Sequence, residues 1–349
     1  MEVFDPRNIL VIDFGQLGDV VLSLPALGAI RKRFPRARIT VAVGKPGAAV
    51  VKLSGFADET LVVDRVALRD GFMPLSIFRV FKIVKDVRQK KFDFVIDLHS
   101  LSETNLLGFL SGAPKRLYSR RPGRSLDYLA NFKPAPPVED NSADSHLIDR
   151  YLRVLVPLGI NGAPREPHLR TRSEDDAVVE SILQKEKASS GVPLVGIYPG
   201  AGHPSRRWPL QRFAELADRL ARIGNVRVVV FAGPEEREMI AEIRATFPSS
   251  ALVLDKLTIP QLASALARLS VLVCNDTGPM HIAAAVGATT IALLDRRAPN
   301  VFLPVGPQHR LIRNYIIDEI PPDEVYDVTC EVLARGRMSE LFARDASRG

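Results

Sequence analysis

The strongest constraint on the fold is an alternation of short apolar runs with amphipathic helical segments, which restarts in the second half of the chain. This alternation is typical of βαβ units, in which helices join parallel strands. In the first half we predict strands at 8–13, 38–43, 60–63 and 93–97, and helices at 19–34, 46–54 and 75–90. In the second half we predict strands at 194–198, 226–231, 251–254, 270–274 and 289–294, and helices at 174–187, 209–222, 234–245, 259–267 and 279–286. We therefore predict an α/β fold with two parallel-sheet domains.

Length and linker composition indicate where the domains divide. The 349 residues, 46% of them apolar, are enough for two cores. A helix at about 144–158 closes the first half, and Gly162, Pro164 and Pro167 after it are typical of a linker. Because open parallel sheets bind ligands at the carboxyl ends of their strands, we expect the ligand site in a cleft between the domains. The predicted parts are domains 1–165 and 166–321 and a segment 322–349, whose helix at about 322–336 could cross back to the first domain.

The cysteines and the apolar pattern bear on location. Cys274 and Cys330 lie far apart, so neither a disulfide framework nor a cysteine metal site is expected. The sequence lacks a basic and apolar leader, and no window of about 18 apolar residues occurs. We expect a cytoplasmic protein that does not span a membrane.

The net charge of +7 is unevenly placed. The stretches 31–38 and 115–124 each contain five Lys or Arg and no acid. They are either solvated faces or a basic surface for anionic lipid, acidic glycan or nucleic acid. Nucleic acid is not expected as a partner, because no aromatic residues are interleaved and no binding motif accompanies the charge.

The first strand-to-helix junction contains Gly15, Gly18 and Asp19. Its Gly-x-x-Gly spacing is not the dinucleotide fingerprint Gly-x-Gly-x-x-Gly. Asp19 either caps the helix or faces the cleft as a general base, beside glycines that let another molecule approach the backbone.

Two further junctions have the composition of ligand loops. Gly200 lies in a glycine-rich loop that leads to Arg206, Arg207 and Trp208, which favours a phosphate pocket, because arginine binds phosphate through two parallel hydrogen bonds. The alternative is a surface loop with Trp208 as a packing plug. Glu235 and Glu236 begin the helix after the next strand. They are either partners of the helix dipole or acceptors for sugar hydroxyls.

The most specific segment runs from Asn275 to His281, where a buried strand ends and Pro279 starts a helix. Backbone N–H groups and the positive end of the helix dipole at such a start bind anions. Thr277 adds a hydroxyl donor and Asp276 an acceptor for sugar hydroxyls, while His281 either reaches a phosphate or is structural. We predict that this segment, including Gly278 and Met280, holds the diphosphate of an activated sugar.

Together these segments resemble the glycosyltransferase family that includes the bacterial ADP-heptose:lipopolysaccharide heptosyltransferases, over most of the chain. The resemblance implies a GT-B fold, with two Rossmann-like domains around a cleft, the first binding the acceptor and the second the nucleotide sugar. The similar segments are Gly18-Asp19 with Leu24-Pro25-Ala26, Asp97-Leu98-His99, Gly112 to Arg116, His146 to Gly159, Pro199-Gly200-Ala201, Arg207-Trp208-Pro209, Gly233-Pro234-Glu235 and Asp276 to His281.

The resemblance implies metal-independent inverting transfer, without a cofactor and with an ADP-sugar as co-substrate. Asp19 matches the family's proposed base. Arg206 stands where the family often has Lys, and a cation there would neutralise the leaving diphosphate. The matched acid is Glu235 or Glu236. The implied partners are the sugar donor and an anionic glycolipid acceptor. In that case the basic stretches 31–38 and 115–124 predict docking to an anionic membrane, at the inner face of a bacterial inner membrane, or to an anionic acceptor.

Two segments depart from the family pattern. After the strand 290–294, where the family commonly has Phe-Gly-Pro-Thr, this chain has Leu294-Asp295-Arg296-Arg297, and after Asp97 it has His99 to Glu103 in place of Gln-Gly. These departures leave two alternatives open. One is an isomerase or epimerase acting on the sugar nucleotide, and the other is an inactive homologue that binds it.

Overall fold

The computed structural model describes residues 4–63, 74–121, 123–139, 145–186, 188 and 191–346, with side chains except for 74–80 and 337–346. The chain divides into two compact units. The first comprises Met1–His168 and Pro299–Leu303, and the second Leu169–Ala298 and Pro304–Gly349. The short segment 299–303 is therefore part of the first unit although both of its neighbours in sequence belong to the second.

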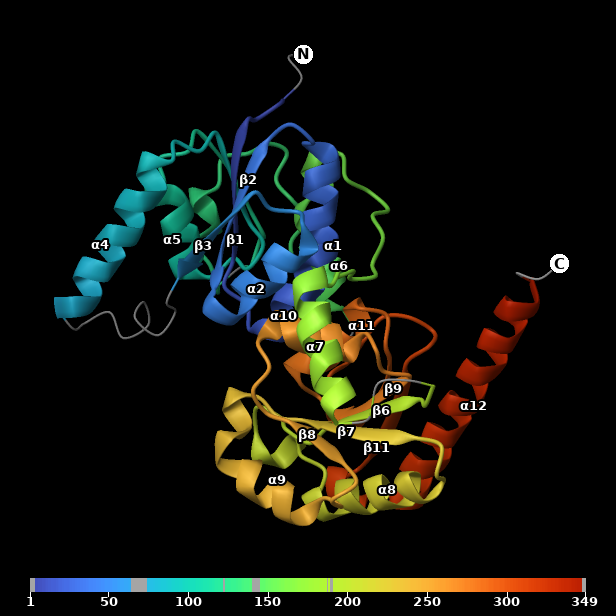
Figure 1. Cartoon of the computed structure of the whole chain (residues 1–349). Helices are drawn as coiled ribbons and strands as arrows, with labels where there is room; N and C mark the ends of the chain where they lie inside the picture. Colours follow the sequence, from blue (N-terminus) through green and yellow to red (C-terminus); the bar gives the residue numbers. More distant parts are fainter. Residues whose placement is uncertain are drawn as a thin grey trace. The chain divides into compact units, whose positions relative to one another are not determined.

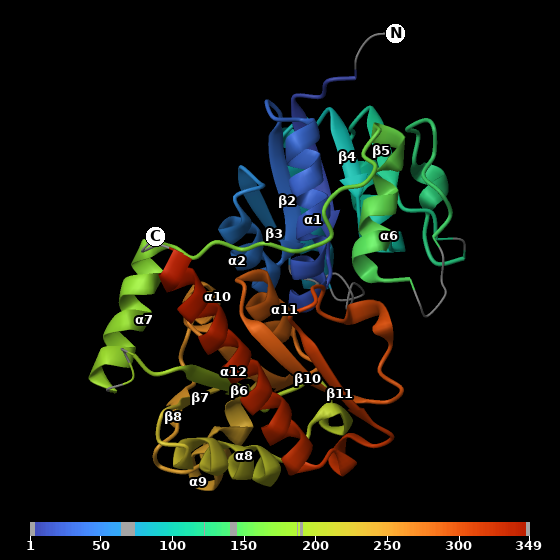
Figure 2. The same cartoon turned by 90° about the vertical axis from the view of Figure 1, so that its right-hand side faces the viewer.

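The described part of the first unit contains a five-stranded parallel sheet in the order β3-β2-β1-β4-β5 (Figure 1). Figure 1 shows α4 and α5 on one side of this sheet and α1 and α6 on the other, and Figure 2 shows α1 and α6 in front of the strands. The strands are β1 Asn8–Asp13, β2 Arg38–Gly44, β3 Glu59–Val63, β4 Phe94–Asp97 and β5 Lys115–Tyr118. The helices are α1 Leu17–Arg33, α2 Lys45–Ser54, α4 Pro74–Gln89, α5 Ser102–Leu110 and α6 Leu147–Val154, with 3₁₀ turns η1 Asp127–Leu129 and η2 Val156–Leu158.

The central strands of this sheet are buried on both faces, because helices cover both sides of a parallel sheet. Leu10, Ile12 and Val95 form one core cluster with Tyr118. The sequence pattern missed α5 and β5. The strand β5 has only four residues, two of them the charged Lys115 and Arg116, so it lacks the apolar run of a central strand.

The segment 299–303 is attached to α6 of the first unit. His146, the N-cap of α6, accepts a hydrogen bond from Ile148 N at Nδ1, so Nε2 is the nitrogen that donates to Leu303 O at 2.9 Å. Burial lowers the pKa of His146 below its ordinary value, which favours this neutral ring.

The described part of the second unit contains a six-stranded parallel sheet in the order β11-β10-β9-β6-β7-β8. Its strands are β6 Leu194–Tyr198, β7 Arg227–Phe231, β8 Leu252–Leu254, β9 Val271–Asn275, β10 Thr289–Asp295 and β11 Arg310–Asn314. Its helices are α7 Ser173–Lys185, α8 Leu210–Arg222, α9 Ile240–Thr246, α10 Ile259–Leu266, α11 Gly278–Ala285 and α12 Pro322–Ala346. The 3₁₀ turns are η3 Pro204–Arg206, η4 Pro234–Met239, η5 Asn300–Phe302, which lies in the first unit, and η6 Ile317–Glu319.

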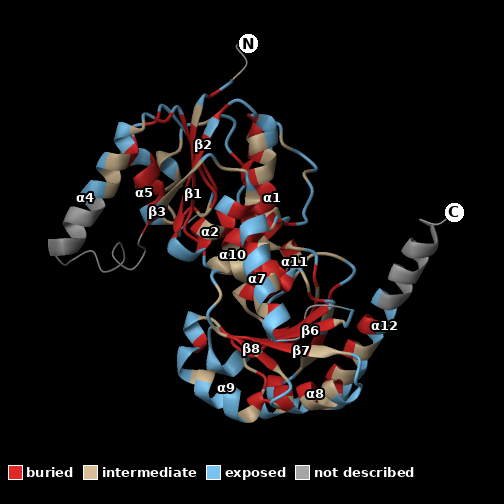
Figure 3. Ribbon diagram, in the orientation of Figure 1, coloured by how far each residue is buried: buried red, intermediate tan, exposed pale blue. Residues whose placement is uncertain are grey.

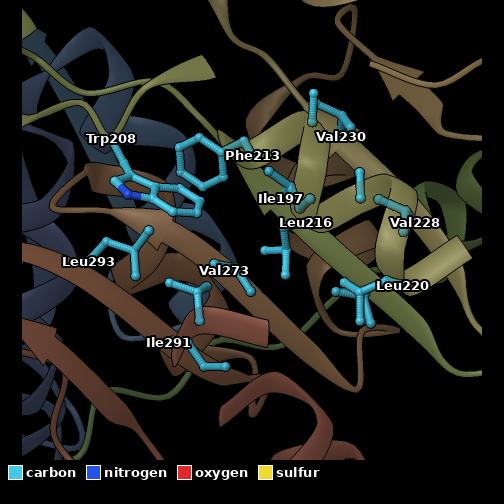
Figure 4. Close-up of a cluster of buried hydrophobic side chains, with 14 of the residues drawn as sticks. Ile197, Trp208, Phe213, Leu216, Leu220, Val228, Val230, Val273, Ile291 and Leu293 are labelled. Carbon is cyan, nitrogen blue, oxygen red and sulfur yellow. The ribbon is translucent and has the colours of Figure 1, made fainter. Parts of the chain in front are cut away.

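Burial follows the layers of this unit, since the strands are buried and the outer faces of α8 and α9 are exposed (Figure 3). A core cluster joins β6, β7, β9 and β10 to α8, with Trp208 and Phe213 packed edge to face (Figure 4). Trp208 is 1% exposed, and its Nε1 donates to Ile320 O at 3.0 Å. Trp208 therefore packs in the core, as expected from the alternative interpretation of its loop.

The final helix packs on the second unit. Val325, Val332 and Leu333 of α12 belong to the same core cluster as Trp208, and α12 lies against α8 and β9. The described side chains of α12 bury their apolar face here, and a crossing of segment 322–349 to the first domain stays a prediction.

Candidate functional site

The loops that follow β6 and β9 adjoin, because these strands are paired with Tyr198 opposite Cys274. Asn275 ties the two loops together. Its Oδ1 accepts a hydrogen bond from Trp208 N at 3.0 Å, and its Nδ2 donates to Pro199 O at 2.8 Å. Asn275 is fully buried, so losing its amide would leave two backbone groups without partners. Asn275 begins the segment predicted to hold the diphosphate, and in the structure its side chain positions both loops.

Two predicted site residues, Arg206 and Asp276, meet across these loops. Arg206 Nη1 lies 3.3 Å from Asp276 Oδ2, and 58% of the Arg206 side chain is exposed against 18% for Asp276. Burial raises the pKa of Asp276 above its ordinary value, and Arg206 partly offsets this. Because more than half of the Arg206 side chain is exposed, its pairing with Asp276 contributes little to stability.

The start of α11 lies directly after Asp276. Thr277 is the N-cap, with extended backbone, and Gly278 is the first helical residue. The first-turn N–H groups of a helix have no partner one turn earlier, which suits an anion. Met280 is fully buried, so its side chain packs inside the second unit, and its contact with a substrate stays a prediction. His281 is 5% exposed, and its contact with a phosphate stays a prediction.

Arg207 is held by contacts within the second unit, and its predicted contact with a phosphate stays a prediction. Its Nε and Nη2 donate to Ala201 O at 3.1 and 3.0 Å, and its Nη1 lies 3.2 Å from Met239 Sδ. The guanidinium therefore fixes the 199–207 loop from within.

Gly200 and Glu236 form a close contact. A β-carbon at Gly200 would overlap Glu236 Oε1, so only glycine fits there. Glu236 is 1% exposed, and its Oε2 accepts hydrogen bonds from Tyr198 Oη at 2.7 Å and Gly233 N at 2.8 Å. Glu235 is exposed. The structure thus separates the two acids, since Glu236 holds the junction together and Glu235 presents its carboxylate to solvent.

In the first unit, Asp19 has the capping role of the alternative interpretation. Its Oδ2 accepts a hydrogen bond from Gln16 N at 2.9 Å, in the first turn of α1, which also contains Gly18. A β-carbon at Gly15 would lie 2.5 Å from Asp19 Cβ and 3.0 Å from Asp13 Oδ1, so both carboxyls flank this glycine. Capping and a role as general base are compatible, because capping occupies one oxygen.

Two further acids of this unit, Asp13 and Asp97, were not among the predicted site residues. Asp13 ends β1 and Asp97 ends the neighbouring β4, and both are fully buried. Asp97 accepts hydrogen bonds from Ser100 N and Asn105 Nδ2, and burial together with the charge of Asp13 raises its pKa to about 7. The signal in the sequence was an acid as the last residue of an apolar strand.

His99, predicted to bind substrate, lies next to these acids. Its Nδ1 is 3.7 Å from Asp13 Oδ1, and its carbonyl oxygen accepts a hydrogen bond from Arg121 at 3.0 Å. Arg121 also pairs with Glu139 at 3.0 Å. The junction therefore combines buried acids with an imidazole and a guanidinium.

The comparisons with known proteins identify the family. Residues 80–326 match the model of glycosyltransferase family 9 (heptosyltransferase). The chain is 27% identical over 319 residues to lipopolysaccharide heptosyltransferase 2 of Salmonella typhimurium, covering 88% of each protein. The chain belongs to glycosyltransferase family 9.

Solved structures of family 9 members share the fold. The glycosyl transferase family 9 structure from Veillonella parvula superposes with a TM-score of 0.83 at 24% identity, covering 96% of this chain and 99% of the other. The ADP-heptose LPS heptosyltransferase II of E. coli gives 0.79 at 22%, covering 95% and 100%. The predicted fold class of two parallel-sheet α/β domains is confirmed, as is the resemblance to this glycosyltransferase family.

The turn Asp295-Arg296-Arg297, at the end of β10, is closed by a local ion pair. Asp295 Oδ1 accepts hydrogen bonds from Arg297 N at 2.7 Å and Nε at 3.2 Å, and Arg297 lowers the pKa of Asp295. Because Leu293 pairs with Asn275, the turn lies on the strand next to the Asp276 junction.

Neither a cluster of metal ligands nor a membrane-spanning helix is found among the described residues of this family 9 member. Across the described residues, no group of three or more His, Cys, Asp or Glu side chains could hold a metal ion. Independence of metal stays a prediction. No helix within the same residues is long and apolar enough to cross a bilayer.

Proposed function

We propose that this family 9 enzyme is an inverting, metal-independent heptosyltransferase. It moves a heptose or related sugar from an ADP-sugar to a lipopolysaccharide core or other lipid-linked glycan, in the cytoplasm at the inner membrane. The observation that carries the proposal is the junction of Arg206 and Asp276 at the start of α11. The names of the relatives support the sugar and the acceptor, since the E. coli protein is an ADP-heptose LPS heptosyltransferase.

The second unit would bind the donor. The N–H groups at Gly278 and beyond, with the positive end of the α11 dipole, stabilise the diphosphate, and Arg206 exchanges Asp276 for a phosphate oxygen. Both groups favour the transition state, because negative charge on the diphosphate grows as its bond to the sugar breaks. Asp276, released from Arg206, then accepts hydrogen bonds from sugar hydroxyls.

The first unit would supply the base. Asp19 takes the proton of the acceptor hydroxyl as that oxygen bonds to the anomeric carbon, and the diphosphate leaves from the opposite face with the electron pair of the broken bond. Neighbouring carboxyls strengthen such a base, since their charge disfavours a second anion.

The substitution Asp19→Asn tests the base and separates it from the cap. The amide oxygen of Asn still accepts from Gln16 N, so α1 stays capped, whereas the base is lost. We expect nucleotide release from ADP-heptose with a core-lipid acceptor to fall about 10²–10⁴-fold, with thermal unfolding almost unchanged. Equal rates for Asp19→Asn, Asp19→Ala and the wild type would show that Asp19 is not the base.

A further inference from the structure

The outer side of the α4, α5 and η1 layer exposes large apolar side chains. Consecutive pieces of this layer pack against one another, α4 on α5 and α5 on η1, over one face of the first sheet (Figures 1 and 3). The exposed fractions are 69% for Phe81, 44% for Leu106, 44% for Phe109 and 75% for Tyr128. Single exposed apolar residues are common, but several aromatic ones on one layer mark an interaction surface.

Helix α4 combines an aromatic residue with cations on its outward face. Phe81, Lys85 and Arg88 are spaced four and three residues apart, so they share a helix face. Ile83 and Val84 pack against the core cluster of the first unit, to which Val87 of the same helix belongs. The outward face therefore presents an exposed phenyl ring with lysine and arginine beside it.

Positive charge surrounds the apolar side chains of this layer. From 81 to 91 the sequence contains five Lys or Arg and one Asp. Farther along the layer, the Arg116 guanidinium lies over the Phe109 ring at 5.3 Å, and Lys115 is exposed. Glu103 is the exposed acid of α5. The balance is positive.

We propose that the α4–α5–η1 face is a docking surface for a membrane of anionic phospholipids. Phe81, Phe109 and Tyr128 enter the interfacial region, and Lys82, Lys85 and Arg88 lie against the headgroups. Aromatic side chains flanked by lysine and arginine are typical of proteins that lie on a membrane surface. A protein partner fits less well, because lysine is depleted from the centres of protein interfaces. The inference rests on the proposed function, because it assigns a surface to the proposed position at the inner membrane, but docking can be measured without sugar transfer.

The basic stretch 31–38 does not serve this role as well. Arg31 pairs with Asp58 at 2.5 Å and Arg38 with Glu59 at 3.2 Å, and Arg33 donates to Leu158 O. Three of its five cations are thus engaged within the first unit. The stretch ends α1 and begins β2, and α1 covers the sheet face opposite α4 and α5 (Figures 1 and 2).

Vesicle sedimentation of the full chain tests the proposal. One set of vesicles contains phosphatidylcholine alone, and the other contains about 30% phosphatidylglycerol as the anionic lipid. We expect binding to the anionic vesicles alone, weakening as NaCl is raised. Lys82→Gln with Lys85→Gln should weaken binding about fivefold per lost charge. Phe81→Gln with Tyr128→Gln should weaken it further at high salt, where burial of rings outweighs charge.

The matched control is Lys32→Gln with Arg36→Gln, two exposed cations on the basic stretch. It removes the same net charge and should leave vesicle binding within about twofold, since the headgroup contacts are elsewhere. Thermal unfolding of each variant shows that it folds. Nucleotide release with an acceptor lacking lipid chains should be unchanged in all of them, so the docking result is independent of the proposed transferase activity.

Three results would overturn the proposal. The wild type could fail to bind anionic vesicles, or the control could lose as much binding as the Lys82 and Lys85 variant. Alternatively, sedimentation velocity without lipid could show a dimer that Phe81→Gln abolishes, in which case the face joins two copies of the chain.

Discussion

The carboxyl ends of neighbouring strands carry opposite chemistry in the two units. After β6 and β9 they carry a guanidinium, a helix start and an amide bridge. After β1 and β4 they carry the buried carboxyls Asp13 and Asp97, with Asp19 close to the first. Both sheets are parallel, so the difference comes from side chains and not from topology. The first arrangement suits an anion, and the second suits a group that exchanges a proton.

The largest expected effect concerns the pH dependence of stability through Asp97. Its pKa is raised from 3.8 to about 7 in the folded state, so the folded state binds this proton more tightly than the unfolded state. The free energy of unfolding should therefore decrease as pH rises through this window, by on the order of 2–4 kcal/mol. Asp97→Asn should remove that decrease, as measured by urea unfolding at several pH values.

The control for Asp97 is Asp176→Asn, since hydrogen bonds to Ser264, Thr171 and Arg268 lower the pKa of Asp176 overall. That variant should keep the decrease. If stability of the Asp97→Asn variant also decreases with rising pH, Asp97 is not the group that holds the proton in the first unit.

Both junctions depend on a glycine that a neighbouring carboxylate crowds. Gly15→Ala and Gly200→Ala should each lower the free energy of unfolding by about 1–3 kcal/mol, because the new methyl group meets Asp19 or Glu236. Gly202→Ala is the matched control, since a β-carbon there meets nothing within 4 Å. If urea unfolding gave the same free energy of unfolding for Gly200→Ala and Gly202→Ala, the crowding of Gly200 by Glu236 would be disproved.

Arg206 and Arg207 should separate ligand binding from stability. Arg206→Ala should lower kcat/KM for the donor about 10–100-fold with unfolding almost unchanged, because the side chain is exposed. Arg206→Lys should retain much of the rate. Arg207→Ala should instead cost about 1–2 kcal/mol of stability, because its guanidinium holds Ala201 O. Steady-state kinetics and thermal unfolding of both variants test this assignment. It would be wrong if Arg206→Ala lost stability while Arg207→Ala lost activity.

The smallest effect is expected at Arg297. Its ion pair with Asp295 is 77% exposed on the arginine side, so Arg297→Ala should change stability by less than about 0.5 kcal/mol. The donor KM should change by less than about threefold. A tenfold rise in KM would instead make this turn part of the donor pocket.

Much of the fold was predictable, because buried parallel strands form apolar runs that the sequence displays directly. The misses have physical causes. The edge strand β11 has two arginines in five residues and so lacks an apolar run, and the helix predicted from 234 begins as the 3₁₀ turn η4 before α9.

The site was less predictable, because hydrogen-bond partners depend on how loops fold. Arg207 has the composition of a phosphate ligand, but its partner is a carbonyl in its own loop. Asp13 and Asp97 read as the last residues of apolar strands, and only the pairing of β1 with β4 brings them together. The pairing of Arg206 with Asp276, 70 positions apart, likewise follows from the pairing of β6 with β9.

The attachment of residues 299–303 to the first unit determines how this enzyme can be recombined with its relatives. The chain leaves the second unit, bonds to His146 through Leu303 O, and returns. A chimera that exchanges everything after His168 would therefore replace part of the first unit along with the second. Exchanging the second unit alone requires three junctions, after 168, 298 and 303, so that residues 299–303 stay with the first unit.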